Sequence, residues 1–593
     1  MIHNFHIPVL GLVFTLDTPL KVARYGISSV VSIVDDMIIE SVRKFHTNKS
    51  NQIFIPILSS EDDYRAKRIT AYLNMLSEMI ASQFEGMKKQ KFITGSDITK
   101  YFEMLPIQSD LKQQYLLMLH IKDNSLKKTL EALLKRRMVL GSIDVNIMSK
   151  VDKVNLNKEG ELTGEINSDA LAALRGFANS NLTSSLVLSA GMNPRLYSYL
   201  ESFPDFLPDA QQQLKKKIIL KVSDFRSAFI QAKFLAKKGI WVSEFRVESG
   251  LNCGGHAFAT EGFLLGPILE EFKNKRSSMI IELFSIYHKA LEAKNIQIND
   301  APTIKITAQG GVGTSDENNL LLNYYQLDGT GWGSPFLLVP EATNVDDETL
   351  KNLIDATQND FYISNSSPLG IPFNNFRKSS SEQQRLDRIA KNRPGSPCTK
   401  KYLVSNTEFT PQPICTASRE YQNFKIKELE GQNLEKEAYQ FKYNAITEKI
   451  CLCEGLVSSF FIKNQILKPK QNKAVAICPG PNLAYFKSTY TLEEMLKHIY
   501  GEINLLEGVE RSHVFINELR LYVEYLKNEV SLTLNAKRNK YFENFKQQLQ
   551  FGINYYKEIV PNLLNKKDKM AKKFMEDLLE MELTLHKLII HPV

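Results

Sequence analysis

The stretch Glu248-Ser-Gly-Leu-Asn-Cys-Gly-Gly-His256 follows a short β-rich run and breaks into glycines where a strand would have to turn. The same pattern returns in Thr307-Ala-Gln-Gly-Gly-Val-Gly313 and in Asp328-Gly-Thr-Gly-Trp-Gly-Ser-Pro-Phe-Leu-Leu338. Strand-then-glycine units separated by helical lengths of chain are typical of a (β/α)₈ barrel, which carries its catalytic residues at the C-terminal strand ends. The three segments therefore predict a barrel, and their glycines predict backbone N–H groups close to a phosphate.

Eight β-like runs precede residue 340, and most are apolar on both faces, as the strands of a covered parallel sheet should be. Helix-like segments lie between several of them, and Phe225–Lys238 and Asp316–Tyr325 are two examples. This alternation predicts an α/β fold, a (β/α)₈ TIM barrel. The runs are Ile7–Phe14, Ile27–Val34, Ser142–Met148, Ser185–Ala190, Lys217–Val222, Trp241–Val247, Pro302–Thr307 and Gly331–Leu338.

At 593 residues the chain is longer than a barrel requires. Helical periodicity between the second and third runs predicts a helical insertion at about 35–141. We expect the barrel to occupy 1–376, a loop-rich segment with most of the cysteines 377–489, and a mainly helical, strongly charged C-terminal region 490–593. Within the first of these, Asp346–Thr357 is expected to form one more helix.

Composition limits the classes of function. Hydrophobic residues make up 43% and charged residues 24% of the chain, which is typical of a soluble globular protein. A net charge of +8 is mild for this size, so nucleic acid is not the expected partner. We find no apolar run of about eighteen residues or more, and therefore expect no membrane span. The N-terminus lacks a basic leader, and only six cysteines are present, so we expect a cytoplasmic protein without disulfides.

Gly310, Gly311, Gly333 and Ser334 fall at the ends of the seventh and eighth runs. In barrels this position often builds a phosphate site. The alternative is that the glycines only make tight turns.

His256 lies just past the sixth run, on the expected catalytic face. A histidine there suits a general base, because its pKa lies near working pH. The alternative is a histidine hydrogen-bonded within its loop. Glu248, at the same strand end, could orient a substrate or cap a neighbouring helix.

Several of these motifs, in their order and spacing, resemble the nitronate monooxygenase (2-nitropropane dioxygenase-like) family of FMN-dependent barrels. That family's Glu, small residue and Gly-Gly-His resemble Glu248-Ser249 and Gly254-Gly255-His256, and its Ala-Gly-Gly-Ile-Gly resembles Ala308–Gly313. Its Gly-Thr-Arg-Phe-Leu resembles Gly333–Leu337. The likeness covers residues 7–34 and 142–376.

The resemblance implies FMN as the cofactor, held through its phosphate by Gly310, Gly311, Gly333 and Ser334. It implies that His256 lies beside the flavin as a base or a substrate-orienting group. The remaining residues expected at the cofactor are Asn146, Lys221, Glu248, Gly255 and Gln309.

The chain also departs from that family. Gly250-Leu-Asn-Cys253 separates the Glu-Ser pair from Gly-Gly-His, and Gly333-Ser-Pro replaces Gly-Thr-Arg. We expect an FMN-dependent oxidoreductase acting on a small or carrier-bound substrate, with NAD(P)H as a candidate electron donor. The alternatives are a flavin-dependent enoyl-thioester reductase of fatty-acid or polyketide synthesis, and a non-catalytic barrel that serves as a binding scaffold.

Five of the six cysteines fall between residues 398 and 478. Clustered thiolates on loops ligate zinc or an iron–sulfur cluster, so Cys398, Cys415, Cys451 and Cys453 are candidate metal ligands. Against this, no Cys-x₂-Cys pair is present, and buried structural cysteines are the alternative.

Overall fold

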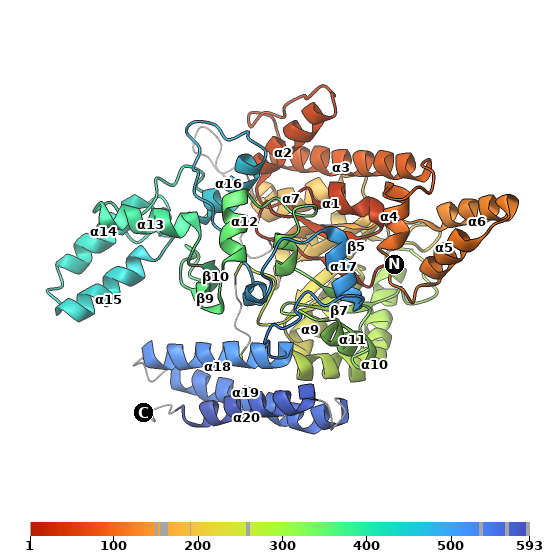
Figure 1. The fold of residues 1–593 in the computed structure, drawn as a ribbon. Coiled ribbons are helices and arrows are strands. Elements are labelled where there is room, and N and C mark those ends of the chain that lie inside the picture. Colours follow the sequence, from red (N-terminus) through yellow and green to blue (C-terminus); the bar gives the residue numbers. More distant parts are fainter. Residues whose placement is uncertain are drawn as a thin grey trace.

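In the computed structural model, eight parallel strands close into a barrel, and each strand pairs with the next one along the chain (Figure 1). β8 pairs back onto β1, with Phe5 opposite Thr330 and His6 opposite Gly331, so the sheet has no open edge. This confirms the predicted (β/α)₈ barrel. The strands are β1 (Phe5–Ile7), β2 (Ser28–Ser32), β3 (Ile143–Ile147), β4 (Ser184–Leu188), β5 (Lys216–Val222), β6 (Val242–Glu248), β7 (Lys305–Gln309) and β8 (Gly329–Gly331). The structure describes residues 2–148, 152–154, 164–189, 191–256, 261–532, 538–563 and 569–588.

The first and last strands do not lie where their apolar runs predicted. β1 ends at Ile7, because Pro8 has no N–H to donate to a ladder, and the apolar residues after it form buried turns. β8 ends at Gly331, and Ser334–Leu338 is a 3₁₀ helix with Pro335 in its first turn. Both predictions were wrong in position, since apolar pattern alone does not separate a strand from another buried segment. The fourth run is a strand as far as Leu188, and its last residue, Ala190, lies outside the described residues.

Helices cover the outside of the barrel between successive strands. The prediction for the helix after β5 is confirmed, and the helix after β7 is fixed by a reciprocal capping box between Thr314 and Glu317. These helices are α1 (Thr18–Val22), α7 (Asp169–Ala178), α8 (Pro194–Tyr199), α9 (Phe225–Ala236), α10 (Leu265–Glu292), α11 (Ser315–Asn323) and α12 (Asp347–Ile354).

The predicted insertion is mainly helical, with a loop at residues 50–63, and part of it belongs to the barrel wall. α3 packs against α7, and Gly176 permits the close approach, because a Cβ there would lie 2.7 Å from the Ile69 Cβ. In Figure 1, α5 and α6 project away from the body of the molecule. The insertion comprises α2 (Asp36–Lys49), α3 (Tyr64–Lys88), α4 (Asp97–Glu103), α5 (Asp110–His120) and α6 (Asn124–Arg137).

The segment expected to be loop-rich contains four helices as well as loops, and a hairpin precedes it. Ser379 and Ser418 accept hydrogen bonds from the backbone N–H groups of Glu382 and Tyr421, so both cap helices that sequence analysis did not predict. Figure 1 shows α14 and α15 as an arm at one end of the molecule. The elements are β9 (Phe361–Ser364), β10 (Phe373–Phe376), α13 (Ser380–Ala390), α14 (Arg419–Glu430), α15 (Lys436–Thr447) and α16 (Leu452–Lys463).

The C-terminal region is helical, as expected, and shares one apolar core with the barrel. Phe515 stacks on Tyr556 with ring centroids 4.9 Å apart, and Gly266 of α10 gives room to the Tyr556 ring. The helices are α17 (Leu492–Tyr500), α18 (Val514–Leu532), α19 (Asn539–Leu563) and α20 (Lys569–His586).

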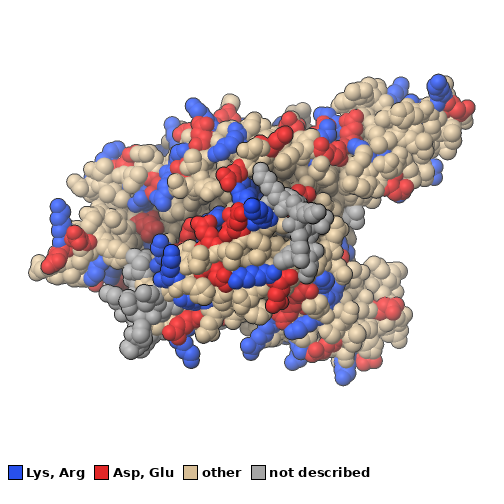
Figure 2. Space-filling view, turned by 60° about the horizontal axis from the view of Figure 1, so that its bottom comes forward, with Lys and Arg blue, Asp and Glu red and all other residues tan. Residues whose placement is uncertain are grey.

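Figure 2 shows acidic and basic side chains interspersed over one face of the molecule. Among the described residues, no helix combines the length and the apolar character needed to cross a bilayer.

Candidate active site at the C-terminal end of the barrel

Four side chains from four strands form a hydrogen-bonded chain within the barrel. The Lys221 ammonium on β5 lies 2.8 Å from the Glu248 carboxylate on β6. Gln309 on β7 donates through Nε2 to the other Glu248 oxygen at 2.8 Å, and its Oε1 lies 3.3 Å from His6 Nε2 on β1. Lys221, Glu248 and Gln309 were all predicted site residues, and the structure brings the three together. His6 was not predicted.

The direction of these hydrogen bonds fixes the state of His6. Because Gln309 donates to a carboxylate, its Oε1 faces His6, and the His6 Nε2 must carry the hydrogen. Burial, reinforced by the positive charge of Arg246, lowers the pKa of His6 to about 3. His6 is therefore a neutral hydrogen-bond donor at neutral pH.

A second charged group fills the barrel interior one layer further in. Glu244, Arg246 and Glu248 alternate along β6 and so share one face of the strand. The Arg246 Nε lies 2.8 Å from Glu244, and its Nη2 lies 3.4 Å from Asp144 on β3. Burial raises the pKa of Asp144. This charged group was not predicted from the sequence. The signal that could have revealed it is the presence of charged residues inside otherwise apolar strands.

The four residues predicted to hold a phosphate are covered by the chain itself. A Cβ on Gly310 would lie 2.9 Å from the Asn252 Cα, and one on Gly333 would lie 2.7 Å from the Cys253 Cβ. A Cβ on Gly311 would clash with the Leu251 side chain. Residues 251–253 belong to the four-residue addition that separates this chain from the family it resembles. In this arrangement the four residues do not fit a phosphate group, so their phosphate role stays a prediction that requires residues 251–253 to move.

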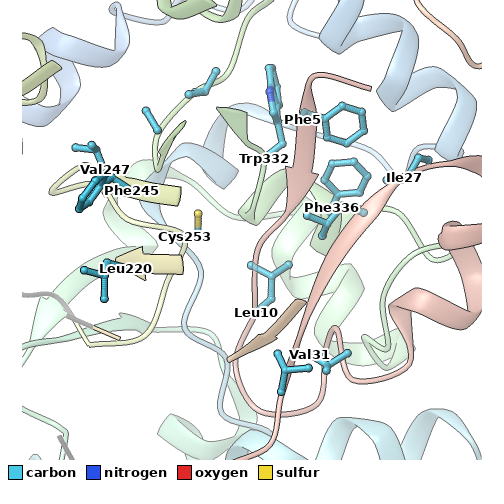
Figure 3. Close-up of a cluster of buried hydrophobic side chains, with 14 of the residues drawn as sticks. Phe5, Leu10, Ile27, Val31, Leu220, Phe245, Val247, Cys253, Trp332 and Phe336 are labelled. Atoms are coloured by element: carbon cyan, nitrogen blue, oxygen red, sulfur yellow. The ribbon is translucent and has the colours of Figure 1, made fainter. Parts of the chain in front are cut away.

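Ser334, the fourth of them, is also engaged. Its Oγ accepts from the Gly480 N–H at 2.8 Å and donates to the Cys253 carbonyl at 3.4 Å. Figure 3 shows Cys253 in a cluster of buried apolar side chains. The start of the added segment is held from α18, where Glu518 accepts from the Ser249 hydroxyl and the Gly250 N–H, both at 2.8 Å.

Arg511, from the loop before α18, completes the cover over β7. Its Nη2 donates to the Gly311 carbonyl at 2.7 Å, and its Nη1 lies 2.6 Å from Glu317 of α11. Glu317 also accepts from the Gly313 N–H at 2.9 Å. Burial alone would raise the pKa of Glu317, but the Arg511 guanidinium and the other groups around the carboxylate, including the Gly313 N–H, together outweigh burial and lower the pKa. The glycine loop after β7 is thus tied to the C-terminal region.

His256 lies in a different setting. Its Nε2 is 2.8 Å from the Ser367 Oγ, its backbone bridges to Phe373 of β10, and its carbonyl accepts from the Asn252 amide at 3.1 Å. The two ring centroids of His256 and Phe373 are 5.4 Å apart in an edge-to-face arrangement. His256 is therefore positioned by the hairpin β9–β10, which follows the barrel in sequence.

His256 borders a cavity of about 180 Å³ at the C-terminal ends of β1, β2 and β3. The predicted site residues Asn146 and Gly255 line the same cavity. No atom lies within 4 Å of a Cβ built on Gly255, so that side of the glycine is open. The walls are otherwise mainly apolar and include Val9, Leu12, Ile33, Met148, Phe373, Leu403, Leu452 and Leu456.

The cysteines predicted as metal ligands do not assemble into a recognisable metal site. Throughout the part of the chain that the structure describes, no group of three or more His, Cys, Asp or Glu side chains is arranged to hold a metal ion. Cys398 and Cys415 are hydrogen-bonded to each other, and burial raises the pKa of Cys453 to about 12. The six described cysteines are free thiols.

No protein-family model and no curated protein sequence matches the chain. Solved structures with some likeness include FabK from Thermotoga maritima, at TM-score 0.36 and 11% identity, covering 88% of this chain and 96% of that one. The enoyl reductase domain of MlnA from Bacillus amyloliquefaciens has TM-score 0.30 and 14% identity over 68% and 87%. Nitroalkane oxidase from Streptomyces ansochromogenes has TM-score 0.33 and 8% identity over 85% and 95%. At these values the likenesses carry no argument, and the fold rests on the closed strand order of the barrel itself.

Proposed function

We propose that the protein is a flavin-dependent oxidoreductase that binds the apolar part of a small or carrier-bound substrate in the cavity beside His256. The observation that carries the proposal is the position of this cavity. It opens at the C-terminal strand ends, where barrel enzymes perform their chemistry, and His256 is the titratable imidazole on its wall.

The fit to FMN differs between the two ends of the cofactor. A mainly apolar wall that carries the Asn146 amide suits part of a planar ring system, although Asp35, Arg65 and Asp169 also line the cavity. The predicted phosphate residues are covered by residues 251–253 and Gly480, so they do not fit the phosphate in this arrangement. A flavin supplies hydride transfer when it is bound.

The chain's own residues have roles that stand apart from the cofactor. The Ser367 hydroxyl orients the His256 ring through Nε2, so the imidazole can hold or release a proton at the cavity wall. The apolar residues of the cavity wall offer a surface for the apolar part of a substrate beside that position. Nitronate-type oxidation and enoyl-thioester reduction both need a proton moved next to an apolar substrate, and NAD(P)H is the proposed electron donor.

The first test is the colour of the purified full-length protein. A flavin-dependent oxidoreductase is yellow, or takes up FMN with a shift of its absorption bands, and NADPH or NADH bleaches them. His256→Ala should leave the flavin bound and slow turnover by about 10²-fold, the scale of a lost general acid or base. His288→Ala, on the exposed side of α10, is the matched control and should change nothing. A colourless protein that does not take up FMN would contradict the proposal of a flavin-dependent enzyme.

A second candidate is a non-catalytic binding barrel. It is favoured by one observation, the cover over Gly310, Gly311 and Gly333. It predicts that the colourless protein still binds an apolar fluorescent probe in the cavity, and that His256→Ala does not weaken this binding by more than about twofold.

A further inference from the structure

Cys398 and Cys415 lie together although sixteen residues separate them. Their thiols are hydrogen-bonded to each other, and both line an open groove of about 1220 Å³ between the α13–α14 loop and the helical arm α14–α15. The backbone on either side is fixed, because Ser396 N–H donates to the Ala417 carbonyl at 2.9 Å and Arg419 N–H donates to the Ser396 carbonyl at 2.8 Å. The two sulfur atoms are thus held next to each other where the loop between the two cysteines begins and ends.

The loop between the two cysteines reaches the cavity beside His256. The Lys400 ammonium lies 2.8 Å from Asp35, and the Tyr402 hydroxyl donates to the same carboxylate at 3.1 Å. Asp35 caps α2 at the end of β2. Tyr402 and Leu403 line the cavity. A bond formed between Cys398 and Cys415 would therefore constrain residues that lie only a few positions from the cavity wall.

We propose that Cys398 and Cys415 form a reversible disulfide that fixes the 398–415 loop against the wall of the His256 cavity. The proposal does not depend on the flavin. The oxidant is a low-molecular-weight disulfide such as oxidised glutathione. The Cys398 thiolate attacks one of its sulfur atoms and releases one glutathione thiolate. Cys415 loses its proton and attacks the Cys398 sulfur, which releases the second thiolate. Two protein thiols are oxidised, one disulfide is reduced to two thiols, and the two protons pass to solvent or to these thiolates.

The surroundings of the two thiols suit these unequal roles. Cys398 is half-buried on the groove, and the hydrogen bond from Cys415 outweighs burial and lowers the pKa of Cys398 to about 7. A low-pKa, accessible thiol beside a second cysteine is the arrangement that redox-responsive proteins use. The pKa of Cys415 is raised first by its hydrogen bond with Cys398 and then by burial. The first of these causes disappears once Cys398 has entered a mixed disulfide, so Cys415 becomes the attacking group only at the second step.

The test uses the full-length protein incubated with reduced and oxidised glutathione at varied ratios. We expect two free thiols per chain to disappear together, a peptide linked through Cys398 and Cys415 in the mass spectrum, and full reversal by dithiothreitol. Trypsin cleavage after Lys400 and Lys401, inside the closed loop, should slow by on the order of tenfold in the oxidised protein. Cys415→Ser should abolish the link and leave a glutathione adduct on Cys398. Cys451→Ser, the matched control in the same neighbourhood, should retain the link.

Three results would overturn the proposal. One is that Cys398 and Cys415 stay free at ratios that oxidise ordinary vicinal thiols. Another is a link that joins Cys451 or Cys453 instead. The third is that zinc alone protects all four thiols from alkylation, which would make them metal ligands. None of these readouts involves FMN, so failure here is distinguishable from failure of the proposed oxidoreductase.

Discussion

The C-terminal face of this barrel has an open side and a closed side. At β1–β3 an apolar cavity remains beside His256 and Asn146. At β6–β8 the glycine-rich strand ends are packed under residues 251–253, Gly480 and Arg511. The same strand-then-glycine pattern thus serves two purposes, because a glycine permits close approach of a ligand and of the chain's own backbone alike. The two purposes differ in what approaches the glycine, a ligand or the chain itself. On the closed side, several of the approaching residues, such as Gly480 and Arg511, are distant in sequence.

The closed side should respond most strongly to loss of Arg511. The Arg511 and Glu317 side chains are 5% and 1% exposed, so Arg511→Met leaves Glu317 as an uncompensated buried charge. We expect a loss of about 3–5 kcal/mol in the free energy of unfolding, measured by urea denaturation. Lys497→Met, which breaks the solvent-exposed pair with Glu493, is the control and should cost less than about 1 kcal/mol. Equal losses in the two variants would mean that Arg511 does not hold the closed side together.

Adjacent glycines mark the border between the two sides. Gly254 and Gly255 both have positive φ, +118° and +85°. A Cβ on Gly254 clashes with the Cys478 carbonyl, whereas a Cβ on Gly255 meets nothing within 4 Å. Gly255→Ala should therefore cost only the backbone strain, about 1–2 kcal/mol. Gly254→Ala should cost about 1–3 kcal/mol more, because backbone must shift to admit the methyl group. Thermal unfolding of the two variants side by side measures the difference, and a Gly255 variant that is the less stable would reverse the assignment of the two sides.

Much of the fold, and less of the site, was predictable from the sequence. The strand-then-glycine segments are local, so they identified the barrel, whereas Lys221, Glu248 and Gln309 were expected at one site through the family resemblance. The cover is not local. Arg511 reaches Gly311 across 200 residues, and the Ser334–Gly480 contact spans 146. No spacing or periodicity reports such a contact. The addition Gly250–Cys253 was visible in the sequence, but only its packing against Gly310 and Gly333 shows what it does.

Acid should weaken the protein through histidines that are buried without charge. Burial lowers the pKa of His513 to about 4, with the repulsion of Arg511 opposed by Glu317, and burial lowers the pKa of His6 to about 3. The unfolded chain binds protons at these positions below pH 6.5, whereas the folded chain does not until pH 3–4. Stability is therefore fully present above pH 6.5 and falls as the pH drops.

Between pH 6.5 and pH 5, each such histidine should remove up to about 2 kcal/mol, on the scale of 1.4 kcal/mol per unit of pKa shift. Urea denaturation at the two pH values measures this loss. His513→Gln, on the closed side, should reduce the loss of unfolding free energy between the two pH values by the contribution of one histidine. An unchanged pH dependence in this variant would show that His513 titrates normally in the folded protein.

The open side should tolerate change best, and Ser367→Ala sharpens that expectation. The Ser367 hydroxyl bonds to His256 Nε2 at 2.8 Å, but His256 is only half-buried and also keeps its backbone bridge to Phe373. The ring can exchange the lost bond for solvent in the cavity, so the free energy of unfolding should fall by less than about 1 kcal/mol. If the free energy of unfolding fell as much as in Arg511→Met, the contacts of His256 would stabilise the fold as strongly as those at β6–β8. The distinction between an open and a closed side would then be wrong. A small loss of stability accompanied by slower turnover would instead show that the Ser367 hydroxyl positions His256 for the reaction on the open side of the barrel.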